Sequence, residues 1–122
     1  MLRGSFEFQG QKCSAASRAY VPTSVWNAIK DEYCADVAKI TVGDPRDFTN
    51  FMSAVIDKKS FDNITGYIDR AKADPGCEIV TGGGYDGSVG YFIEPTTIVC
   101  SDPKYESMSE EIFGPVLSVY VY

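Results

Sequence analysis

Hydrophobic residues recur every three or four positions in two stretches of the chain, which is the pattern of an amphipathic helix. The first stretch follows Thr23 and Ser24, either of which can cap a helix, and runs to about residue 39. The second begins after Asp57 or Ser60 and ends at Asp74-Pro75-Gly76. The apolar positions are Val25, Trp26, Ile29, Tyr33 and Val37, then Phe61, Ile64, Ile68 and Ala71. We therefore predict two helices.

Between and around these helices lie segments with the composition of strands. They are residues 17–21, which end at Pro22, and then 78–81, 91–93, 96–99 and 116–122. Pro95 separates two of them, which favours an edge or bulged strand there. The order strand, helix, helix, strands predicts an α/β fold with a mixed sheet. If the terminal run 116–122 is unpaired it invites pairing with another chain, and its position suggests a piece of a longer polypeptide.

Composition narrows the class of protein. A chain of 122 residues forms one small domain or part of a larger one, and 44% hydrophobic residues are enough for a core. The net charge of −6 argues against a nucleic-acid partner. No apolar run approaches the roughly 20 residues of a membrane helix, so we expect no membrane partner. Residues 1–5 lack the features of a targeting segment, and we expect none in this chain.

Cysteine and histidine usage restricts the possible chemistry. The four cysteines stand at 13, 34, 77 and 100, too far apart for a Cys-x-x-Cys pair, and there is no histidine. We therefore expect no metal site and no Cys-His pair within the chain. Spacing alone leaves disulfides open, although reduced thiols fit the composition better.

The segment Gly10-Gln11-Lys12-Cys13-Ser14-Ala15 sets one cysteine among small, polar and cationic residues. A thiol attacks a carbonyl carbon as its thiolate, which needs positive charge nearby and open access. Lys12 is expected to supply the charge, and Gly10 room for a substrate. The alternative is that Cys13 is packed and inert, as most free cysteines are.

Two further motifs need an interpretation. The Gly82-Gly83-Gly84 run lacks the residues of a phosphate-binding loop, so we interpret it as a turn after a strand. In the segment 110–116, two carboxylates precede a large ring and a Gly-Pro turn. Taken alone, this segment is compatible with solvated acids, a core Phe113 and an ordinary turn.

Two segments of the chain closely resemble two signature segments of the aldehyde dehydrogenase superfamily, and they stand in the family's order. They are Phe8-Gln9-Gly10-Gln11-Lys12-Cys13-Ser14-Ala15 and Glu110-Glu111-Ile112-Phe113-Gly114-Pro115-Val116. Several other segments look like its branch of delta-1-pyrroline-5-carboxylate dehydrogenases. These are 42–45, 53–57, 89–95 and 114–122.

The resemblance implies a role for several residues. Cys13 is similar to the family nucleophile, and Ser14 to a residue that binds the carboxylate end of the substrate. Glu111 matches the acid that hydrogen-bonds the nicotinamide ribose of NAD, and Phe113 the ring that packs on the nicotinamide. Glu110 matches the motif without an assigned role. The implied reaction is the NAD-dependent oxidation of L-glutamate γ-semialdehyde to L-glutamate in proline breakdown, through a thiohemiacetal and a thioester.

The resemblance also implies what surrounds the chain. Residues 1–122 look like a segment of the catalytic domain, from the nucleophile loop to the Glu-Ile-Phe-Gly-Pro motif, while the NAD-binding domain and the general base lie outside. The implied enzyme acts on a small aldehyde, is a homo-oligomer and works in the mitochondrial matrix. The alternative is a non-catalytic fragment that acts as a binding or assembly module, through its terminal strand.

Overall fold

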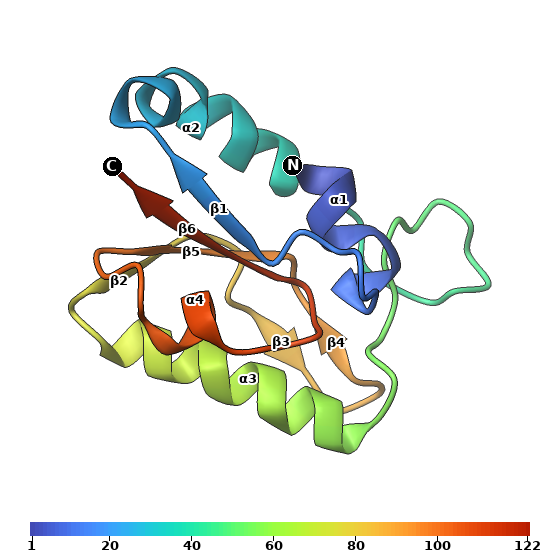
Figure 1. Cartoon of the computed structure of the whole chain (residues 1–122). Helices are drawn as coiled ribbons and strands as arrows, with labels where there is room; N and C mark the ends of the chain where they lie inside the picture. Colours follow the sequence, from blue (N-terminus) through green and yellow to red (C-terminus); the bar gives the residue numbers. More distant parts are fainter.

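A four-stranded sheet forms the centre of the molecule, and the computed structural model describes all of residues 1–122 (Figure 1). The strand order is β1 (Arg18–Val21), β6 (Val116–Val121), β5 (Thr96–Cys100) and β2 (Cys77–Thr81). β1, β6 and β5 are parallel, and β2 runs antiparallel to β5. This confirms the predicted α/β class with a mixed, mostly parallel sheet.

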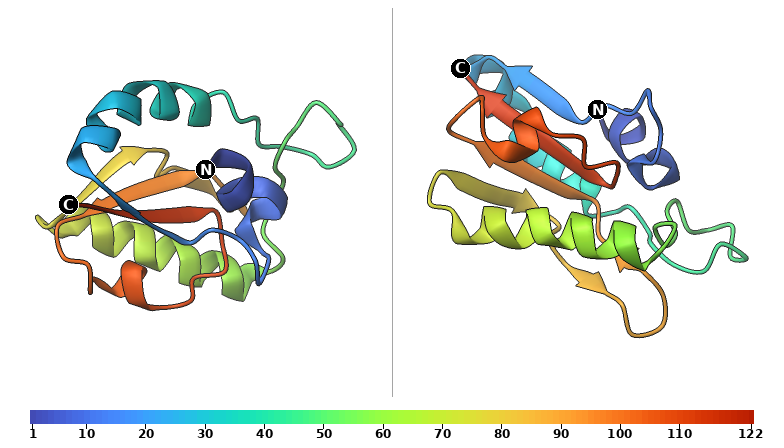
Figure 2. Two further views of the ribbon diagram at one scale, coloured as in Figure 1. Left: turned by 45° about the horizontal axis from the view of Figure 1, so that its top comes forward. Right: turned by 60° about the horizontal axis from the view of Figure 1, so that its bottom comes forward.

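Helices cover both faces of the sheet, so that the molecule has three layers (Figure 2). α2 (Thr23–Val37) lies on one face, where the Tyr33 hydroxyl is 2.8 Å from Oγ1 of Thr97 on β5. α3 (Lys58–Ala73) and the short α4 (Glu106–Ser109) lie on the other. Along β6, Val116 joins the core under α3, whereas Leu117 and Val119 join the core under α2. A strand covered on both faces is mostly apolar, as β6 is; its one serine, Ser118, is buried and donates a hydrogen bond to the Ser107 hydroxyl at 2.8 Å.

The N-terminal residues and one hairpin complete the fold. α1 (Leu2–Phe6) leads into a 3-10 turn, η1 (Glu7–Gly10), and β3 (Tyr85–Asp86) pairs with β4 (Phe92–Ile93) in a separate small sheet. α1, η1 and α4 were not predicted, because each is too short to show a hydrophobic period. No helix is sufficiently long and apolar to cross a membrane.

The predicted capping residue is correct for one of the two long helices and wrong for the other. Asp57 caps α3 as one of the two expected candidates, since its carboxylate accepts a hydrogen bond from the Ser60 N–H at 2.7 Å. α2 instead has Pro22 at its cap, and neither Thr23 nor Ser24 makes a capping bond. The Thr23 hydroxyl donates to the Tyr122 carbonyl at 2.9 Å, so it joins the end of β6 to α2.

The expectation of an edge or bulged strand around Pro95 is confirmed in part. Before the proline, β4 lies in a two-stranded sheet, and after it the ladder of β5 with β2 has a register shift between Ile79 and Thr81. β5 itself is an interior strand, because the proline lies just outside the ladder and Thr96 makes the first backbone bond, to the Pro115 carbonyl at 2.9 Å. The expectation of an unpaired terminal strand is wrong, since β6 lies between β1 and β5. The turn at Gly82-Gly83-Gly84 follows β2 as predicted, with positive φ at Gly82 and Gly83.

Candidate active site

Cys13 lies at the tip of a tight turn. The Ala15 N–H donates to the Lys12 carbonyl at 3.1 Å, which makes Cys13 and Ser14 the two central residues, and both are exposed. The backbone N–H of Cys13 has no acceptor among the hydrogen bonds of the chain. The turn therefore presents a thiol, a hydroxyl and a free amide donor to the outside.

Neighbouring segments hold this turn in place. The Ala16 N–H donates to the Gly4 carbonyl at 2.9 Å, which fixes the turn to α1. Gln9 donates through Nε2 to the Ala54 carbonyl at 3.0 Å, and Gln11 accepts through Oε1 from the Ile56 N–H at 2.9 Å. Both glutamines stand in the cysteine motif, yet their role was not predicted, because their partners lie 45 residues away.

Lys12 does not serve as a free positive charge beside the thiol. Its ammonium is 2.5 Å from the Glu7 carboxylate, and the two side chains are partly exposed. The hydrogen bond and the charge of Lys12 lower the pKa of Glu7 below its ordinary value. The expected activation of Cys13 by Lys12 is thus weakened, since the nearest acid neutralises the lysine.

Gly10 has a structural task instead of the predicted one of making room for a substrate. It is buried, and its φ of 66° follows two residues that are also left-handed, Phe8 and Gln9. A Cβ at Gly10 would lie 2.2 Å from the Gly114 carbonyl oxygen. Gly10 is therefore where the cysteine motif and the Glu-Ile-Phe-Gly-Pro motif touch, 104 residues apart in sequence.

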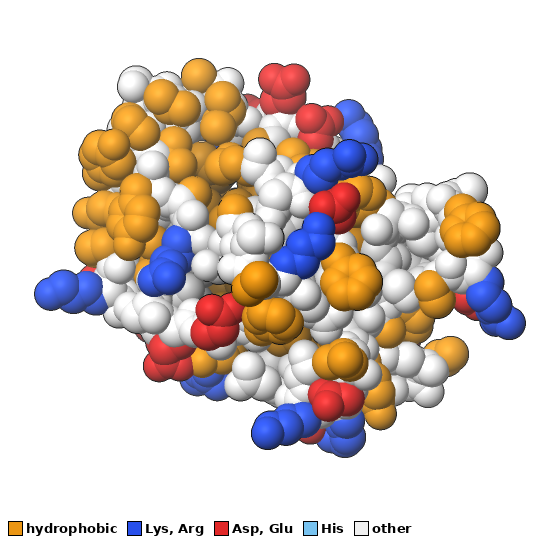
Figure 3. Space-filling model, turned by 45° about the vertical axis from the view of Figure 1, so that its right-hand side comes forward, with side chains coloured by type: hydrophobic (Ala, Val, Ile, Leu, Met, Phe, Trp, Pro, Cys, Tyr) orange, Lys and Arg blue, Asp and Glu red, His pale blue; other side chains and the backbone are white.

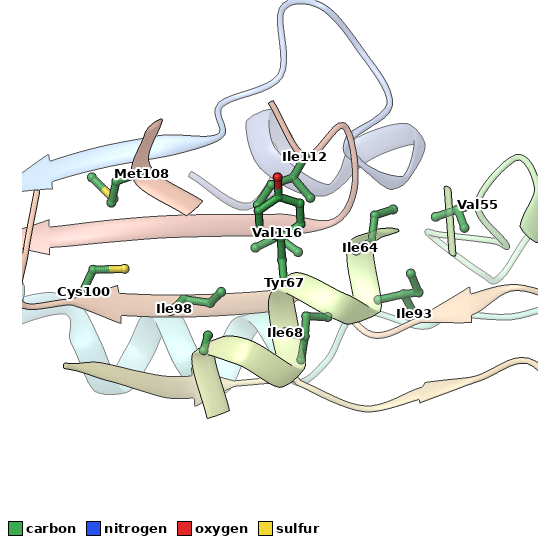
Figure 4. Close-up of a cluster of buried hydrophobic side chains, with 11 residues drawn as sticks. Val55, Ile64, Tyr67, Ile68, Ile93, Ile98, Cys100, Met108, Ile112 and Val116 are labelled. Carbon is green, nitrogen blue, oxygen red and sulfur yellow. The ribbon is translucent and has the colours of Figure 1, made fainter. Parts of the chain in front are cut away.

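The second motif presents Glu111 and Phe113 on either side of a buried anchor. Ile112 is 7% exposed and packs in the core under α3, beside Tyr67 and Val116 (Figure 4). Its two neighbours point outward, and Phe113, with a left-handed φ of 57°, is 46% exposed. An alternating in-and-out loop thus exposes one carboxylate and one aromatic ring.

Glu110 ties this loop to α3. The Tyr67 hydroxyl donates a short hydrogen bond to the Glu110 carboxylate, and this bond raises the pKa of Tyr67. Arg70 lies 4.6 Å from the Tyr67 ring centre and pairs with Glu106 at 2.7 Å. Sequence reasoning left Glu110 without a role, because nothing local connects it to a tyrosine 43 residues earlier.

The two motifs line one small hollow. Lys12 and Ala15 from the turn and Glu111 and Phe113 from the loop surround about 10 Å³ of open space. The Ser5 hydroxyl, which also lines it, is buried and has no hydrogen-bond partner. All four expected residues are exposed, but only Glu111 and Phe113 line the hollow; Cys13 and Ser14 stand between its lining residues Lys12 and Ala15 in the turn. No group of three or more acidic, cysteine or histidine side chains is placed to bind a metal ion.

One face of the molecule carries both hydrophobic and charged side chains. Figure 3 shows a continuous group of hydrophobic side chains at the upper left and smaller ones elsewhere, interspersed with Lys or Arg and Asp or Glu. Phe8 is 62% exposed and Phe48, on the long loop after α2, is 96% exposed. The positively charged, uniform surface that nucleic acid selects is absent from this view.

Comparison with known proteins places this geometry in a family. A sequence profile of the aldehyde dehydrogenase family matches residues 1–122. The mitochondrial delta-1-pyrroline-5-carboxylate dehydrogenase of Dictyostelium discoideum is 60% identical over 99% of this chain, and that of Homo sapiens is 53% identical over 99%. The chain spans 22% of the length of each relative.

Solved structures agree. The crystal structure of Mycobacterium tuberculosis delta-pyrroline-5-carboxylate dehydrogenase bound with NAD superposes with a TM-score of 0.87 and 44% identity. The comparison covers 99% of this chain and 21% of that one. The three-layer arrangement and the sequence therefore point to the same group of proteins.

Proposed function

The chain belongs to the aldehyde dehydrogenase family, and on that premise we propose that it carries the nucleophile and part of the nicotinamide site of an NAD-dependent L-glutamate γ-semialdehyde dehydrogenase. The observation that carries this proposal is the exposed Cys13 in a turn whose residues Lys12 and Ala15 line the same hollow as Glu111 and Phe113. Because the chain spans 22% of its relatives' length, the activity is proposed for the longer enzyme that contains it.

Cys13 is the proposed nucleophile. Its thiolate adds to the aldehyde carbon and gives a thiohemiacetal whose oxygen carries negative charge. The unpartnered N–H of Cys13 can donate to that oxygen, a contact that typically contributes about 3 kcal/mol to the transition state. After oxidation the acyl group stays on the sulfur as a thioester, from which water releases L-glutamate. Sulfur suits both steps, because it attacks readily and leaves readily.

Glu111 and Phe113 fit an NAD site. An exposed carboxylate can accept hydrogen bonds from ribose hydroxyls, and an aromatic ring with 46% of its surface open can pack on the nicotinamide. Bound NAD⁺ supplies the hydride acceptor of the reaction. Glu110 acts on this site indirectly, since its bond to Tyr67 positions the loop that bears Glu111 and Phe113.

Ser14 is the proposed contact for the substrate's carboxylate end. It shares the turn with Cys13 and is exposed, so its hydroxyl can donate to an anion held near the sulfur. We further propose that residues 1–122 form a segment of the catalytic domain and that the enzyme is a homo-oligomer. By analogy with relatives named as mitochondrial, we place it in the mitochondrial matrix.

The test is Cys13→Ala in the full-length enzyme, with NAD⁺ binding measured separately by fluorescence titration. We expect turnover to fall by on the order of 10⁴-fold or more while NAD⁺ affinity stays within about twofold. Cys34→Ala is the matched control, because Cys34 lies on α2 and should leave turnover unchanged. Retained turnover in the Cys13 variant would overturn the proposal.

The proposed substrate has its own test. Ser14→Ala should raise KM for the semialdehyde, with a much smaller effect on a short aldehyde that lacks a carboxylate. An equal effect on both aldehydes would contradict the proposed role of Ser14 and would leave the role of Cys13 unaffected.

A further inference from the structure

A second pair of thiols lies far along the chain from Cys13. Cys77 on β2 and Cys100 on β5 are direct partners in the antiparallel ladder, and their sulfur atoms are 4.0 Å apart. No other two cysteine sulfurs are within contact of each other. We propose that Cys77 and Cys100 are a thiol pair that a hydroperoxide converts, slowly at neutral pH, to a reversible cross-strand disulfide.

The register of the two strands favours this bond. The Ser101 N–H donates to the Gly76 carbonyl at 2.9 Å, immediately beyond the cysteine pair. A bond in that position marks the cysteines as a non-hydrogen-bonded pair, in which Cα atoms are about 4.5 Å apart and side chains are closest. Disulfides are formed at Cα separations of roughly 4.4 to 6.8 Å. The sulfurs need only rotate toward each other, without movement of either strand.

The pair can also be reached. β2 is an edge strand, and a hollow of about 250 Å³ at its end is lined by both cysteines, with Pro75 and Glu78 at its margin. Cys77 is partly exposed, whereas Cys100 is 1% exposed. A small oxidant therefore meets Cys77 first, and Cys100 acts as the resolving thiol.

The chemistry balances with hydrogen peroxide as the oxidant. The Cys77 thiolate attacks one peroxide oxygen, the O–O bond breaks, and a sulfenic acid and water result. The Cys100 thiolate then attacks the Cys77 sulfur and displaces the hydroxyl group as a second water. Two thiols and one peroxide give one disulfide and two waters. Burial raises the pKa of Cys77 to about 12 and also raises that of Cys100, so the pair reacts slowly at neutral pH.

Disulfide formation has a structural consequence near the site. In the reduced chain, the Cys100 sulfur is 3.7 Å from the Ser107 hydroxyl on α4, which accepts from the Ser118 hydroxyl at 2.8 Å. Closing the sulfurs to about 2.05 Å turns Cys100 away from Ser107. α4 immediately precedes Glu110 and Glu111, so its loosening should reach the loop of the second motif.

The test uses the folded 122-residue chain, treated with hydrogen peroxide and then unfolded and alkylated. Trypsin followed by a glutamate-specific protease separates residues 73–78 from residues 79–104, each with one cysteine. We expect these two peptides to be joined, lighter than their sum by two hydrogens and separable by dithiothreitol. Backbone hydrogen exchange over residues 106–111 should become faster in the oxidised chain.

Two controls make the result specific. Cys34→Ser should leave the yield of the linked peptides unchanged, and Cys77→Ala should abolish it. The wild-type chain oxidised in urea should give mixed linkages among all four cysteines, which shows that the fold selects the pair even if a variant fails to fold. The proposal is overturned if Cys77 and Cys100 stay alkylatable in the native chain after Cys13 is oxidised. It is equally overturned if the linkage is as frequent in urea. Neither outcome bears on the proposed dehydrogenase activity.

Discussion

The substitution Gly10→Ala tests the contact between the two motifs. The added Cβ would lie 2.2 Å from the Gly114 oxygen and 2.9 Å from the Ser5 oxygen, both of them backbone atoms. Moving backbone to relieve such an overlap costs about 1–3 kcal/mol. The left-handed φ of 66° adds about 1–2 kcal/mol once the residue has a side chain. Together we expect a loss of about 2–5 kcal/mol.

That loss is large for a small domain, whose total stability is about 5–15 kcal/mol. Urea unfolding followed by circular dichroism should show a much lower midpoint for the variant. Gly4→Ala is the matched control. Gly4 lies within α1, and a Cβ added there would meet only the Ala16 Cβ, at 3.9 Å. We expect it to be neutral or stabilising by about 0.5–1 kcal/mol. If the two variants unfold at the same urea concentration, the claim that Gly10 is needed for the contact between the two motifs is wrong.

Three further predictions concern the surroundings of the site. Tyr67→Phe removes the hydrogen bond to Glu110 and should lower the free energy of unfolding by about 1 kcal/mol; an unchanged urea midpoint would contradict the anchoring role. Ser5→Ala removes a buried hydroxyl without a partner, so calorimetry should show an unchanged or higher melting temperature, and a clear decrease would reveal a partner. Glu7 should titrate by NMR below the ordinary glutamate value of 4.5, and Lys12→Met should raise its midpoint; an unchanged midpoint would contradict the ion pair.

The pH dependence follows from the sign of the Glu7 shift. A carboxyl whose pKa is lowered in the folded chain stabilises it fully above the unfolded value, and this stabilisation is lost as the pH falls through the folded value. The contribution of Glu7 should therefore begin to fall below about pH 4.5 and be lost only once the pH is below the lowered pKa of Glu7 in the folded chain. In the Lys12→Met variant this part of the acid sensitivity should be absent, as acid titration of the fold can measure.

Periodicity alone was sufficient for the layers of the fold and insufficient for the pairing of its strands. The helical stripe from Phe61 to Ala71 has one interpretation, and α3 follows it. The interior position of β5 after Pro95 and that of the terminal run β6 were not predicted, because a strand's neighbours are set by contacts distant in sequence. β6 pairs with β1, which lies nearly 100 residues earlier, and a local pattern carries no information on that pairing.

The candidate site divides in the same way. The two sequence motifs were enough to predict the candidate site residues Cys13, Ser14, Glu111 and Phe113. The resemblance to the family supplied their expected roles. The hydrogen bonds that hold the two motifs in place could not be predicted from the sequence, because Gln9, Gln11 and Glu110 each bind a partner more than 40 residues away. Lys12 was misjudged for the opposite reason, because Glu7 was close in sequence and its competing charge was not considered.

The most direct measurement is mass spectrometry of the full-length enzyme, acid-quenched during turnover of L-glutamate γ-semialdehyde with NAD⁺. Trypsin releases residues 13–18, a peptide with a single cysteine. The account predicts a glutamyl thioester on that peptide, which disappears when NAD⁺ is omitted. An acyl group found on another residue, or steady turnover with that peptide always unmodified, would contradict it.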